Sequence, residues 1–365
     1  MEIRKKIERV MTTCEKSRGA GLFDTLLYLF SCIYAGAMNL RALFYRKGLF
    51  KSQTLLCTVI SVGNLTVGGT GKTPLTIYVV DLLRGLGYNV AVLSRGYKGK
   101  MYKAGGIVSD GQKIYMDSIA AGDEPYLIAD RLKDVPVLVG QNRFKMGKMA
   151  ISRFSAQILV MDDGFQHMQL DRDIDLLLLD TASPFGNGHC IPRGPLREPV
   201  KGIRRASAIV LTRQAHKASP HQAGFVEEVN SGARIFRCMH VPERLFVAGT
   251  ERPLDLEALK GRRLFAFSGI GRNDSFRETV TQLGGSIDDF VEFFDHYRYS
   301  TDDLRSVWRK AVDLKVDNLV TTEKDYVRIR GGFPKAPQLL VLGISLSFGR
   351  DKDVFERYLK SQICK

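Results

Sequence analysis

The sequence predicts an α/β protein in which helices cover both faces of a mostly parallel sheet. Near-continuous apolar segments recur at 156–161, 174–179 and 208–211, and each ends in acidic or hydroxyl residues. A further apolar strand, at 58–62, leads through a glycine-rich turn into a helix. Apolar strands that alternate with helices and end in polar residues are typical of a parallel sheet buried on both faces.

The most specific motif lies at 58–78, which reads TVISVGNLTVGGTGKTPLTIY. Glycines let backbone N–H groups converge on phosphate oxygens, and a helix N-terminus adds partial positive charge. This pattern predicts a P-loop, in which Lys72 reaches the β- and γ-phosphates and the Thr73 hydroxyl ligates Mg²⁺. The residues expected to bind the nucleotide are Gly68, Gly69, Thr70, Gly71, Lys72 and Thr73. A ligand-free glycine turn is the alternative, because Thr66 stands where the usual spacing has a glycine.

Composition narrows the class of protein. The 365 residues suffice for two domains with a sizeable core, and the 44% hydrophobic content is that of a folded chain. The net charge of +15 favours an anionic partner, which can be a nucleic acid, a membrane surface or a phosphorylated substrate. The six cysteines are scattered without a C-x-x-C pair, so we expect reduced thiols and neither a disulfide frame nor a zinc site.

Residues 1–45 are expected to form a helical segment at a membrane. A basic amphipathic stretch at 1–20 precedes an uncharged run at 25–40, and Arg41, Arg46, Lys47 and Lys51 follow. Because a spanning helix needs about 20 apolar residues, the run favours a helix lying in the cytoplasmic membrane face over one that spans. A buried N-terminal helix that docks on the core is the alternative.

Two α/β domains are predicted after this segment. The first, at 46–232, contains the P-loop and the mostly parallel sheet. The second and smaller, at 233–346, is joined by two antiparallel linker strands at 234–239 and 338–346. Inside it we expect strands at 264–268, 287–293 and 318–321, with helices from 274 and at 301–314. The tail, 347–365, is expected to return to the first domain.

Acidic residues at strand ends are the first candidates for chemistry. Asp162 ends an apolar strand, as in a Walker B motif, and would hold Mg²⁺ opposite Thr73 because strand ends converge on the P-loop. Gln166 and His167 add an amide and an imidazole nearby. A solvated strand end is the alternative for Asp162. Arg197 and Glu198, fixed between two prolines, suit a phosphate and its metal, or simply form a charged loop.

Three further residues have two interpretations each. Asp123 follows a glycine and could accept a proton from an attacking hydroxyl, although a helix N-cap is the commoner role and is favoured by pattern alone. His296 is the only histidine flanked by an acid and aromatics, and it could be a structural imidazole bonded to Asp295. Lys324 could bind a nucleotide or phosphate, or belong to a surface charge cluster.

Seven motifs occur in a fixed order along the chain. They are VGNLTVGGTGKTP (62–74), LSRGYKG (93–99), GDEP (122–125), DDGFQH (162–167), PRGPLRE (192–198), FFDHY (293–297) and TTEKD (321–325). Taken together, these motifs resemble the tetraacyldisaccharide 4′-kinases, the lipid A 4′-kinases of Gram-negative bacteria. The resemblance covers about residues 20–330, and the combination of motifs is far more specific than any one of them. The resemblance also accounts for Thr66, because the loop of that family departs from the standard spacing.

The resemblance implies a magnesium-dependent, monotopic enzyme at the cytoplasmic face of the inner membrane. It would transfer the γ-phosphate of ATP to the 4′-hydroxyl of a tetraacyldisaccharide 1-phosphate in lipopolysaccharide biosynthesis, forming lipid IVA. Asp123 would be the general base and His296 its partner from the other domain, so catalysis would depend on domain closure. Lys72, Arg143 and Mg²⁺ would neutralise charge, with Thr73, Asp162 and Glu198 around the metal. Auxiliary contacts would come from Arg95, Asp163, Gln166, His167, Arg197 and Lys324.

The resemblance also bears on partners. An acylated sugar phosphate and an anionic membrane surface are expected, and the basic stretches 95–103 and 201–217 could meet anionic head groups or be solvated faces. No protein partner is predicted. A membrane-associated regulatory ATPase is a rival, but its loop carries a lysine where Val67 stands here. A nucleic-acid binder is not expected, because no zinc finger, helix-turn-helix or RNA-binding motif occurs.

Overall fold

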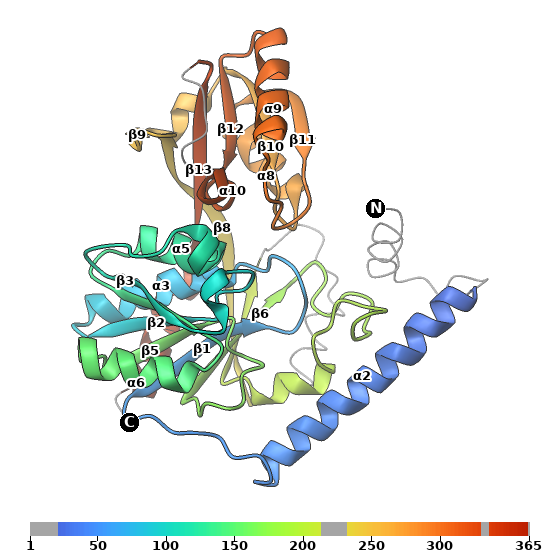
Figure 1. The fold of residues 1–365 in the computed structure, drawn as a ribbon, viewed down its shortest axis with the longest axis vertical. Coiled ribbons are helices and arrows are strands. Elements are labelled where there is room, and N and C mark those ends of the chain that lie inside the picture. The colour runs from blue at the N-terminus through green and yellow to red at the C-terminus, as the bar shows by residue number, and fades with distance from the viewer. Residues whose placement is uncertain (1–20, 213–231, 330–335, 364–365) are drawn as a thin grey trace. The chain divides into compact units, whose positions relative to one another are not determined.

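The computed structural model describes residues 21–212, 232–329 and 336–363 (Figure 1). The chain divides into two compact units. Unit 1 contains Met1–Ser94, Asn142–Met239 and Ser347–Lys365, and unit 2 contains Arg95–Gln141 and His240–Leu346. The basic stretch expected at 1–20, the basic residues expected at 213–217 and the rest of the first predicted domain up to residue 231 lie outside the described residues.

Unit 1 is built on a parallel sheet with the order β8-β7-β6-β1-β5-β2. The strands are β1 (Thr58–Asn64), β2 (Val90–Ser94), β5 (Ile158–Asp162), β6 (Ile174–Asp180), β7 (Ala208–Thr212) and the first part of β8 (Arg234–Val247). Nearly every residue of the central strands is buried, which explains why they read as continuous apolar runs. The predicted α/β fold with a mostly parallel sheet is confirmed.

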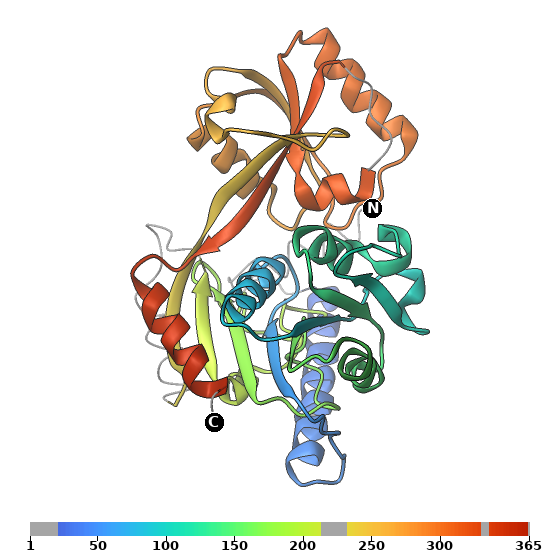
Figure 2. The same cartoon turned by 90° about the vertical axis from the view of Figure 1, so that its left-hand side faces the viewer.

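Helices α3 (Lys72–Gly85), α6 (Arg143–Phe154) and α11 (Lys352–Ile363) pack in unit 1. On α3, Leu75, Val79 and Leu83 recur every four residues and are fully buried, which is the periodicity of a helix with one apolar face. The C-terminal helix α11, red in Figure 2, lies beside the sheet. Its Phe355 ring stands 5.1 Å from that of Phe236 on β8. Residues 347–365 therefore pack in the unit that contains the P-loop motif.

Helix α2 (Leu22–Arg46) is the long helix of unit 1 (Figure 1). It extends beyond the uncharged run 25–40 at both ends. Leu27 and Ser31 are buried, and the Ser31 hydroxyl donates a 2.8 Å hydrogen bond to the carbonyl of Cys190. The opposite side exposes large apolar side chains. They are Leu22, Leu26, Leu29, Phe30, Ile33 and Leu40. The alternative of a buried helix that docks on the core thus accounts for one face of α2 only.

Unit 2 has its own parallel sheet, with the order β11-β10-β12-β13 followed by β8. The elements are β10 (Arg263–Ser268), β11 (Ser286–Glu292), β12 (Asn318–Thr322), β13 (Gln338–Ser347), and β9 (Arg252–Leu254), which pairs antiparallel with β8. Alternate residues of β10 face two helices. Phe265 and Phe267 pack with α9 (Thr301–Asp313), while Leu264 and Ala266 pack with α8 (Asn273–Gln282).

Residues 95–141 also belong to unit 2. They form the antiparallel pair β3 (Gly106–Asp110) and β4 (Pro136–Val139), and the helices α4 (Ser118–Ala121) and α5 (Asp123–Arg131). Helix α5 packs against α10 (Glu323–Ile329), where Arg131 and Glu323 form a 2.9 Å ion pair. The predicted domain 46–232 includes residues 95–141, whereas the contacts place this segment in unit 2. The domain assignment at 46–232 and 233–346 stays a prediction. The 3₁₀ helices lie at Lys100–Tyr102, Val200–Arg205, Leu256–Leu259 and Gly349–Asp351.

Candidate functional site

The glycine-rich turn of unit 1 joins β1 to α3. Gly68 and Gly71 have φ angles of 112° and 94°, a region that favours glycine, so these two positions of the motif are required by the backbone. The Asn64 side chain closes the turn, donating to the carbonyl of Thr66 at 2.7 Å and to Thr70 Oγ1 at 2.9 Å. Its amide oxygen accepts from Lys72 Nζ at 3.3 Å. Asn64 is a residue that the sequence reasoning missed.

The proline-flanked loop braces this turn. The peptide N–H of Val67 donates to the carbonyl of Pro195 at 2.8 Å, and that of Arg197 donates to the carbonyl of Leu65 at 2.7 Å. These two backbone bonds fix the loop beside the turn. The predicted residues Arg197 and Glu198 are thereby brought next to the P-loop motif.

The two acidic residues after β5 also lie there. Asp162 pairs in register with Val62 at the end of β1, is 1% exposed, and accepts a 3.0 Å hydrogen bond from Thr76 Oγ1. Asp163 has a φ of 53° and contacts Arg197 Nη1 at 2.7 and 2.8 Å and Lys72 Nζ at 3.6 Å. Burial opposes its ionisation, but the charges of Lys72 and Arg197 outweigh it and hold the pKa of Asp163 well below its usual range.

Arg143 and Gln166 connect these parts. Arg143, at the start of α6, is 3% exposed and donates from Nη2 to the carbonyls of Asp162 and Asp163 at 3.4 and 3.3 Å. Gln166 Nε2 donates to the carbonyl of Asn64 at 2.8 Å and to Glu198 Oε1 at 2.9 Å. Polar contacts thus link most of the predicted residues of unit 1, namely Thr70, Lys72, Arg143, Asp162, Asp163, Gln166, Arg197 and Glu198.

His167 is tied in through its backbone, with its peptide N–H 2.8 Å from the carbonyl of Gly164. Arg205 is a further residue that the sequence reasoning missed. Its Nη2 donates to Glu198 Oε1 at 2.8 Å, so that oxygen has two donors. Arg205 lies seven positions after Glu198, within a basic stretch of the sequence. Nothing in that stretch distinguishes Arg205 from its basic neighbours as the partner of Glu198.

The donor chemistry of unit 1 suits a magnesium ion bound together with a nucleotide. Mg²⁺ usually takes one or two carboxylates or hydroxyls and completes its shell with phosphate oxygens and water. Asp162 and the Thr73 hydroxyl supply such donors. Glu198 Oε1 is engaged by Arg205 and Gln166, so its place in a metal shell stays a prediction. The described residues contain no group of three or more His, Cys, Asp or Glu side chains that could hold a metal by themselves.

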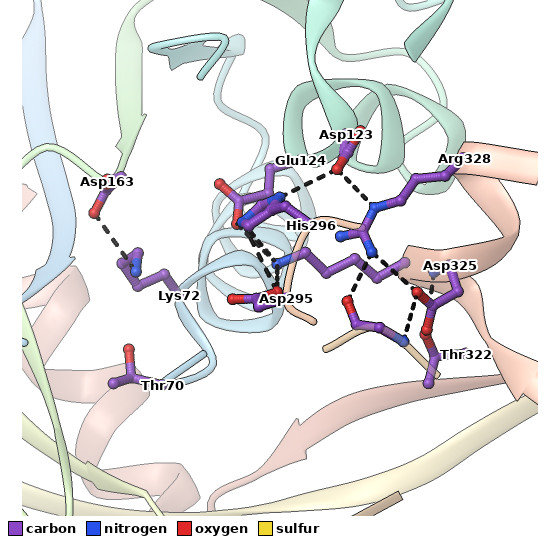
Figure 3. A network of polar contacts seen from close by, with 12 residues as sticks. Thr70, Lys72, Asp123, Glu124, Asp163, Asp295, His296, Thr322, Asp325 and Arg328 are labelled. Atoms are coloured by element: carbon purple, nitrogen blue, oxygen red, sulfur yellow. Dashed lines mark hydrogen bonds and ion pairs between the residues drawn. The ribbon is translucent and has the colours of Figure 1, made fainter. Parts of the chain in front are cut away.

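In unit 2, Asp123 is the first residue of α5. The N-cap position belongs to Gly122, and no side-chain cap bond is made there, so the capping role favoured by the sequence pattern is not the one observed. The Asp123 carboxylate instead contacts His296 Nδ1 at 3.1 Å and accepts a 2.7 Å hydrogen bond from Arg328 Nε (Figure 3). Burial alone would raise the pKa of Asp123. His296 and Arg328 have the larger, opposite effect and bring this pKa down to about 2.

His296 lies in the turn after β11 with a φ of 58°. The Tyr97 ring stands edge-on to the imidazole, with the ring centroids 6.0 Å apart. Asp295 Oδ1 is 4.0 Å from His296 Nε2, which is too long for a hydrogen bond. The Asp295-bonded imidazole that we considered from the sequence is therefore not observed. Asp123 and His296 belong to the same unit, so their contact needs no movement of one unit against the other.

Lys324 is engaged by carboxylates. Its Nζ lies 3.2 Å from Glu124 Oε1 and 3.6 Å from Asp295 Oδ1. Burial lowers the pKa of Lys324, but these two carboxylates raise it more. The Lys324 ammonium group thus lies between two carboxylates. This environment differs from both interpretations made from the sequence, an unpaired lysine that binds phosphate and a member of a surface charge cluster. A phosphate contact of Lys324 stays a prediction.

Two charged residues of α10 were missed by the sequence reasoning. Arg328 is 4% exposed on its side chain and donates from Nη1 to the carbonyl of Gly269 at 2.8 Å and to Asp325 Oδ1 at 3.0 Å. Asp325 is fully buried and also accepts from Tyr299 Oη at 2.8 Å. The spacing Asp325-x-x-Arg328 gave a signal for the pair, but not for Asp123 as its partner.

Arg95 stands apart from the Asp123–His296 contact. It is exposed, and its guanidinium donates from Nη2 to Tyr102 Oη at 3.0 Å and lies 5.4 Å from the centroid of that ring. The carbonyl oxygen of Lys98 accepts a 3.3 Å hydrogen bond from Arg298 Nη2. The basic stretch 95–103 therefore packs partly on its own aromatic residue within unit 2.

The comparisons with known proteins agree along almost the whole chain. Residues 23–364 match the family LpxK, tetraacyldisaccharide-1-P 4′-kinase. A tetraacyldisaccharide 4′-kinase of Desulfatibacillum aliphaticivorans is 41% identical over 99% of this chain and 98% of its own length. One from Syntrophus aciditrophicus is 44% identical over 90% of each chain. A crystal structure of LpxK from Aquifex aeolicus, in complex with ATP, matches with a TM-score of 0.76 and 33% identity, covering 94% of this chain and 100% of that one.

Proposed function

The chain belongs to the tetraacyldisaccharide 4′-kinase family of lipid A biosynthesis, and we propose that it transfers the γ-phosphate of ATP to the 4′-hydroxyl of a tetraacyldisaccharide 1-phosphate. The product is the bisphosphorylated lipid IVA. The observation that carries the proposal is the Asp123–His296 contact of 3.1 Å in unit 2. A carboxylate held by an imidazole is a suitable acceptor for the proton of a sugar hydroxyl.

The P-loop of unit 1 is the proposed ATP site. Lys72 and the N–H groups at the start of α3 bind the phosphates, and Arg143 and Arg197 add positive charge beside them. The Aquifex aeolicus relative was crystallised with ATP, which supports this assignment. Asp162 and Thr73 would hold Mg²⁺, which supplies charge neutralisation on the β- and γ-phosphates when bound.

Asp123 acts as the general base in this proposal. The sugar oxygen forms a bond to the γ-phosphorus, the bond from that phosphorus to the bridging oxygen of ADP breaks, and the hydroxyl proton passes to Asp123. A pKa of about 2 makes Asp123 a weak base, yet keeps it ionised at neutral pH. A weak base suffices in a loose transition state, because the nucleophile needs orientation more than early deprotonation.

The membrane proposal rests on α2. Its 25 residues are long enough to cross a bilayer, and its exposed stripe recurs at helical spacing, from Leu22 through Leu29 and Ile33 to Leu40. The other face is tied down, with Tyr34 Oη donating to the carbonyl of Arg197 at 2.8 Å. A helix with one docked face and one apolar face suits an interfacial position, with the exposed Arg46 and Lys47 toward anionic head groups. We propose a peripheral or monotopic location at the cytoplasmic face of the inner membrane.

The test is transfer of radiolabelled phosphate from ATP and Mg²⁺ to a tetraacyldisaccharide 1-phosphate in detergent micelles. The wild type is compared with Asp123→Ala and with Asp302→Ala, a control on an exposed aspartate of α9. We expect labelled lipid from the wild type and the control, and a loss of ~10²–10⁴-fold in rate for Asp123→Ala with ATP binding retained. Hydrolysis of ATP without labelled lipid would contradict the proposal. Equal transfer by all three proteins would remove Asp123 from the role of base.

A further inference from the structure

Helix α10 contributes two cations to the Asp123–His296 pair. Lys324 and Arg328 are four positions apart, a spacing that puts side chains on one face of a helix. Arg328 Nε donates to Asp123 Oδ2 at 2.7 Å, and Lys324 Nζ lies 3.5 Å from His296 Nε2. Each end of the pair therefore contacts a positive charge from the same helix. Figure 3 shows the Arg328 contact at the Asp123 end.

The guanidinium of Arg328 is positioned independently of Asp123. Its Nη1 donates to the carbonyl of Gly269 and to Asp325 Oδ1. Asp325 is in turn held by Tyr299 Oη at 2.8 Å and by Thr322 Oγ1 at 2.6 Å. Because these contacts fix the guanidinium plane, Nε is a preformed donor for one oxygen of Asp123. Among the described residues of unit 2, both hydrogen bonds to the Asp123 side chain end on Oδ2, not Oδ1.

The position of Lys324 determines which nitrogen of His296 carries the proton. An ammonium group has three donors and no acceptor, so its approach to Nε2 is favourable only if that nitrogen has a lone pair. Nδ1 then carries the hydrogen of the neutral ring and donates it to Asp123 Oδ2. The alternative tautomer would place N–H against ammonium at one end and a lone pair against a carboxylate oxygen at the other.

We propose that α10 sets the protonation of the pair, with Lys324 holding the Nδ1–H tautomer of His296 and Arg328 fixing Asp123 so that Oδ1 receives the substrate proton. Both are positioning residues, since they act through His296 and Asp123. The role of Oδ1 rests on the proposed kinase function, whereas the tautomer does not.

The charges around the ring explain why Lys324 matters. The titratable and charged groups that face His296 are Asp123 and Glu124 from α5, Tyr97 from the loop after β2, Asp295 from its own turn, and Lys324 and Arg328 from α10. Three of these are carboxylates, which accept a hydrogen bond from an N–H group on either ring nitrogen. Lys324 is a donor that faces Nε2, and it also pairs with Glu124 and Asp295. Without Lys324, we expect the Nδ1–H tautomer to lose its preference.

The experiment is NMR spectroscopy of the full-length chain labelled with ¹⁵N-histidine, in which a protonated ring nitrogen and one with a lone pair give different shifts. His296 is assigned by the signal lost in His296→Gln. In the wild type at alkaline pH we expect hydrogen on Nδ1 and a lone pair on Nε2. In Lys324→Met we expect the preference for the Nδ1–H tautomer to weaken, with part of the neutral ring population carrying its hydrogen on Nε2. A wild-type ring protonated on Nε2 alone would overturn the proposal, as would an unchanged tautomer in Lys324→Met.

Kinetics separate positioning from folding. Lys324→Met is expected to lower kcat for phosphate transfer by roughly 10–100-fold, as loss of an outer partner commonly does, without changing the KM for ATP. Arg328→Gln removes a charge that lowers the pKa of Asp123, so the acid limb of the pH–rate profile is expected to move to higher pH. Lys324→Arg and Arg328→Lys keep the charges and should restore part of each effect.

A matched control exists on α9. Asp302 and Arg305 have the same spacing and ion pair as Asp325 and Arg328, but they are exposed to solvent. Arg305→Gln should leave the rate, the acid limb and the His296 signals unchanged. If the Arg328→Gln variant has a lower thermal stability but an unchanged acid limb of the pH–rate profile, the role of Arg328 is purely structural. A wild type with the expected tautomer and an active Asp123→Asn variant would refute Asp123 as base while leaving the tautomer assignment intact.

Discussion

Arg197 Nη1 lies 2.7 Å from Oδ1 and 2.8 Å from Oδ2 of Asp163, so one guanidinium nitrogen bridges both oxygens of the carboxylate. Lys72, the lysine of the P-loop motif, is 3.6 Å from the same carboxylate. Asp163 therefore holds two of the cations proposed to bind phosphate. The arrangement keeps these side chains in place before a nucleotide binds and offsets the repulsion between them.

This triad predicts a pH-dependent contribution to the stability of unit 1. Asp163→Asn is expected to lower the free energy of unfolding at pH 7 by about 1–3 kcal/mol, because two cations lose their anion. The native pKa of Asp163 is depressed, so the stabilisation is fully present above the unfolded value of about 3.9 and is lost as the pH falls below it. Urea unfolding of both proteins at a series of pH values checks this.

The control for that series is Asp171→Asn, which changes an exposed aspartate of the same unit. Its effect should stay within about 0.5 kcal/mol at every pH. A difference between wild type and Asp163→Asn that persists unchanged in acid would show that the ionised carboxylate is not the source of the stability.

Lys72 is expected to affect catalysis more than folding. Lys72→Met removes the cation proposed for the β- and γ-phosphates, so phosphate transfer should fall by about 10²–10³-fold, the usual cost of losing one charge-stabilising group. Lys148→Met, on the exposed face of α6, is the control and should retain full activity. The label-transfer assay in micelles measures both variants. A loss smaller than about tenfold would argue against the phosphate contact.

Gly122 is predicted to be essential for placing Asp123. It has a φ of 95°, and a Cβ there would lie 2.9 Å from the carbonyl oxygen of Tyr97. Gly122→Ala should therefore cost about 1–3 kcal/mol in stability and also lower the transfer rate, since α5 must shift. Thermal unfolding and the transfer assay measure the two effects.

Gly249 offers a matched comparison in the same unit. Its φ of 80° is similar, but a Cβ there would meet nothing within 4 Å. Gly249→Ala should show only the backbone strain, about 1–2 kcal/mol, and normal kcat. If both alanine variants behave alike, the close approach of Tyr97 has no part in positioning Asp123.

The exposed stripe of α2 predicts binding to lipid. A Leu29→Asn, Ile33→Asn double variant should reduce co-sedimentation with vesicles of anionic phospholipid several-fold, because each change removes an apolar side chain that is more than half exposed. Val312→Asn, which changes an exposed apolar residue on α9, is the control. Retention of vesicle binding by the double variant would contradict the membrane proposal for this stripe.

The strands were the most predictable part of the structure. The apolar runs ending at Asp162 and Asp180 are fully buried central strands, and the glycine pattern before Lys72 marks a turn that its φ angles require. Such features are local, so the sequence records them directly.

Long-range partners were harder to predict. Arg328 contacts Asp123 from 205 positions away, and nothing in the segment around either residue specifies that pairing. The placement of residues 95–141 in unit 2 depends on α5 and the short pair β3–β4, whose patterns are too brief to indicate a partner. The sequence favoured a helix-cap role for Asp123 for the same reason. The residues next to Asp123 indicate a helix start, but they do not indicate His296 or Arg328 as its partners.

The discontinuous makeup of unit 2 has a consequence for synthesis. Asp123 and His296 are 173 positions apart, and β13, which completes the sheet of unit 2, comes later still. A ribosome therefore releases the whole P-loop segment well before the proposed acid–base pair can assemble. Contacts of such sequence separation form slowly, so a nascent or truncated chain would have phosphate-binding groups and Asp123, but not the His296 and Arg328 side chains that hold this carboxylate. Competence for catalysis would then arise only when nearly the entire polypeptide has emerged.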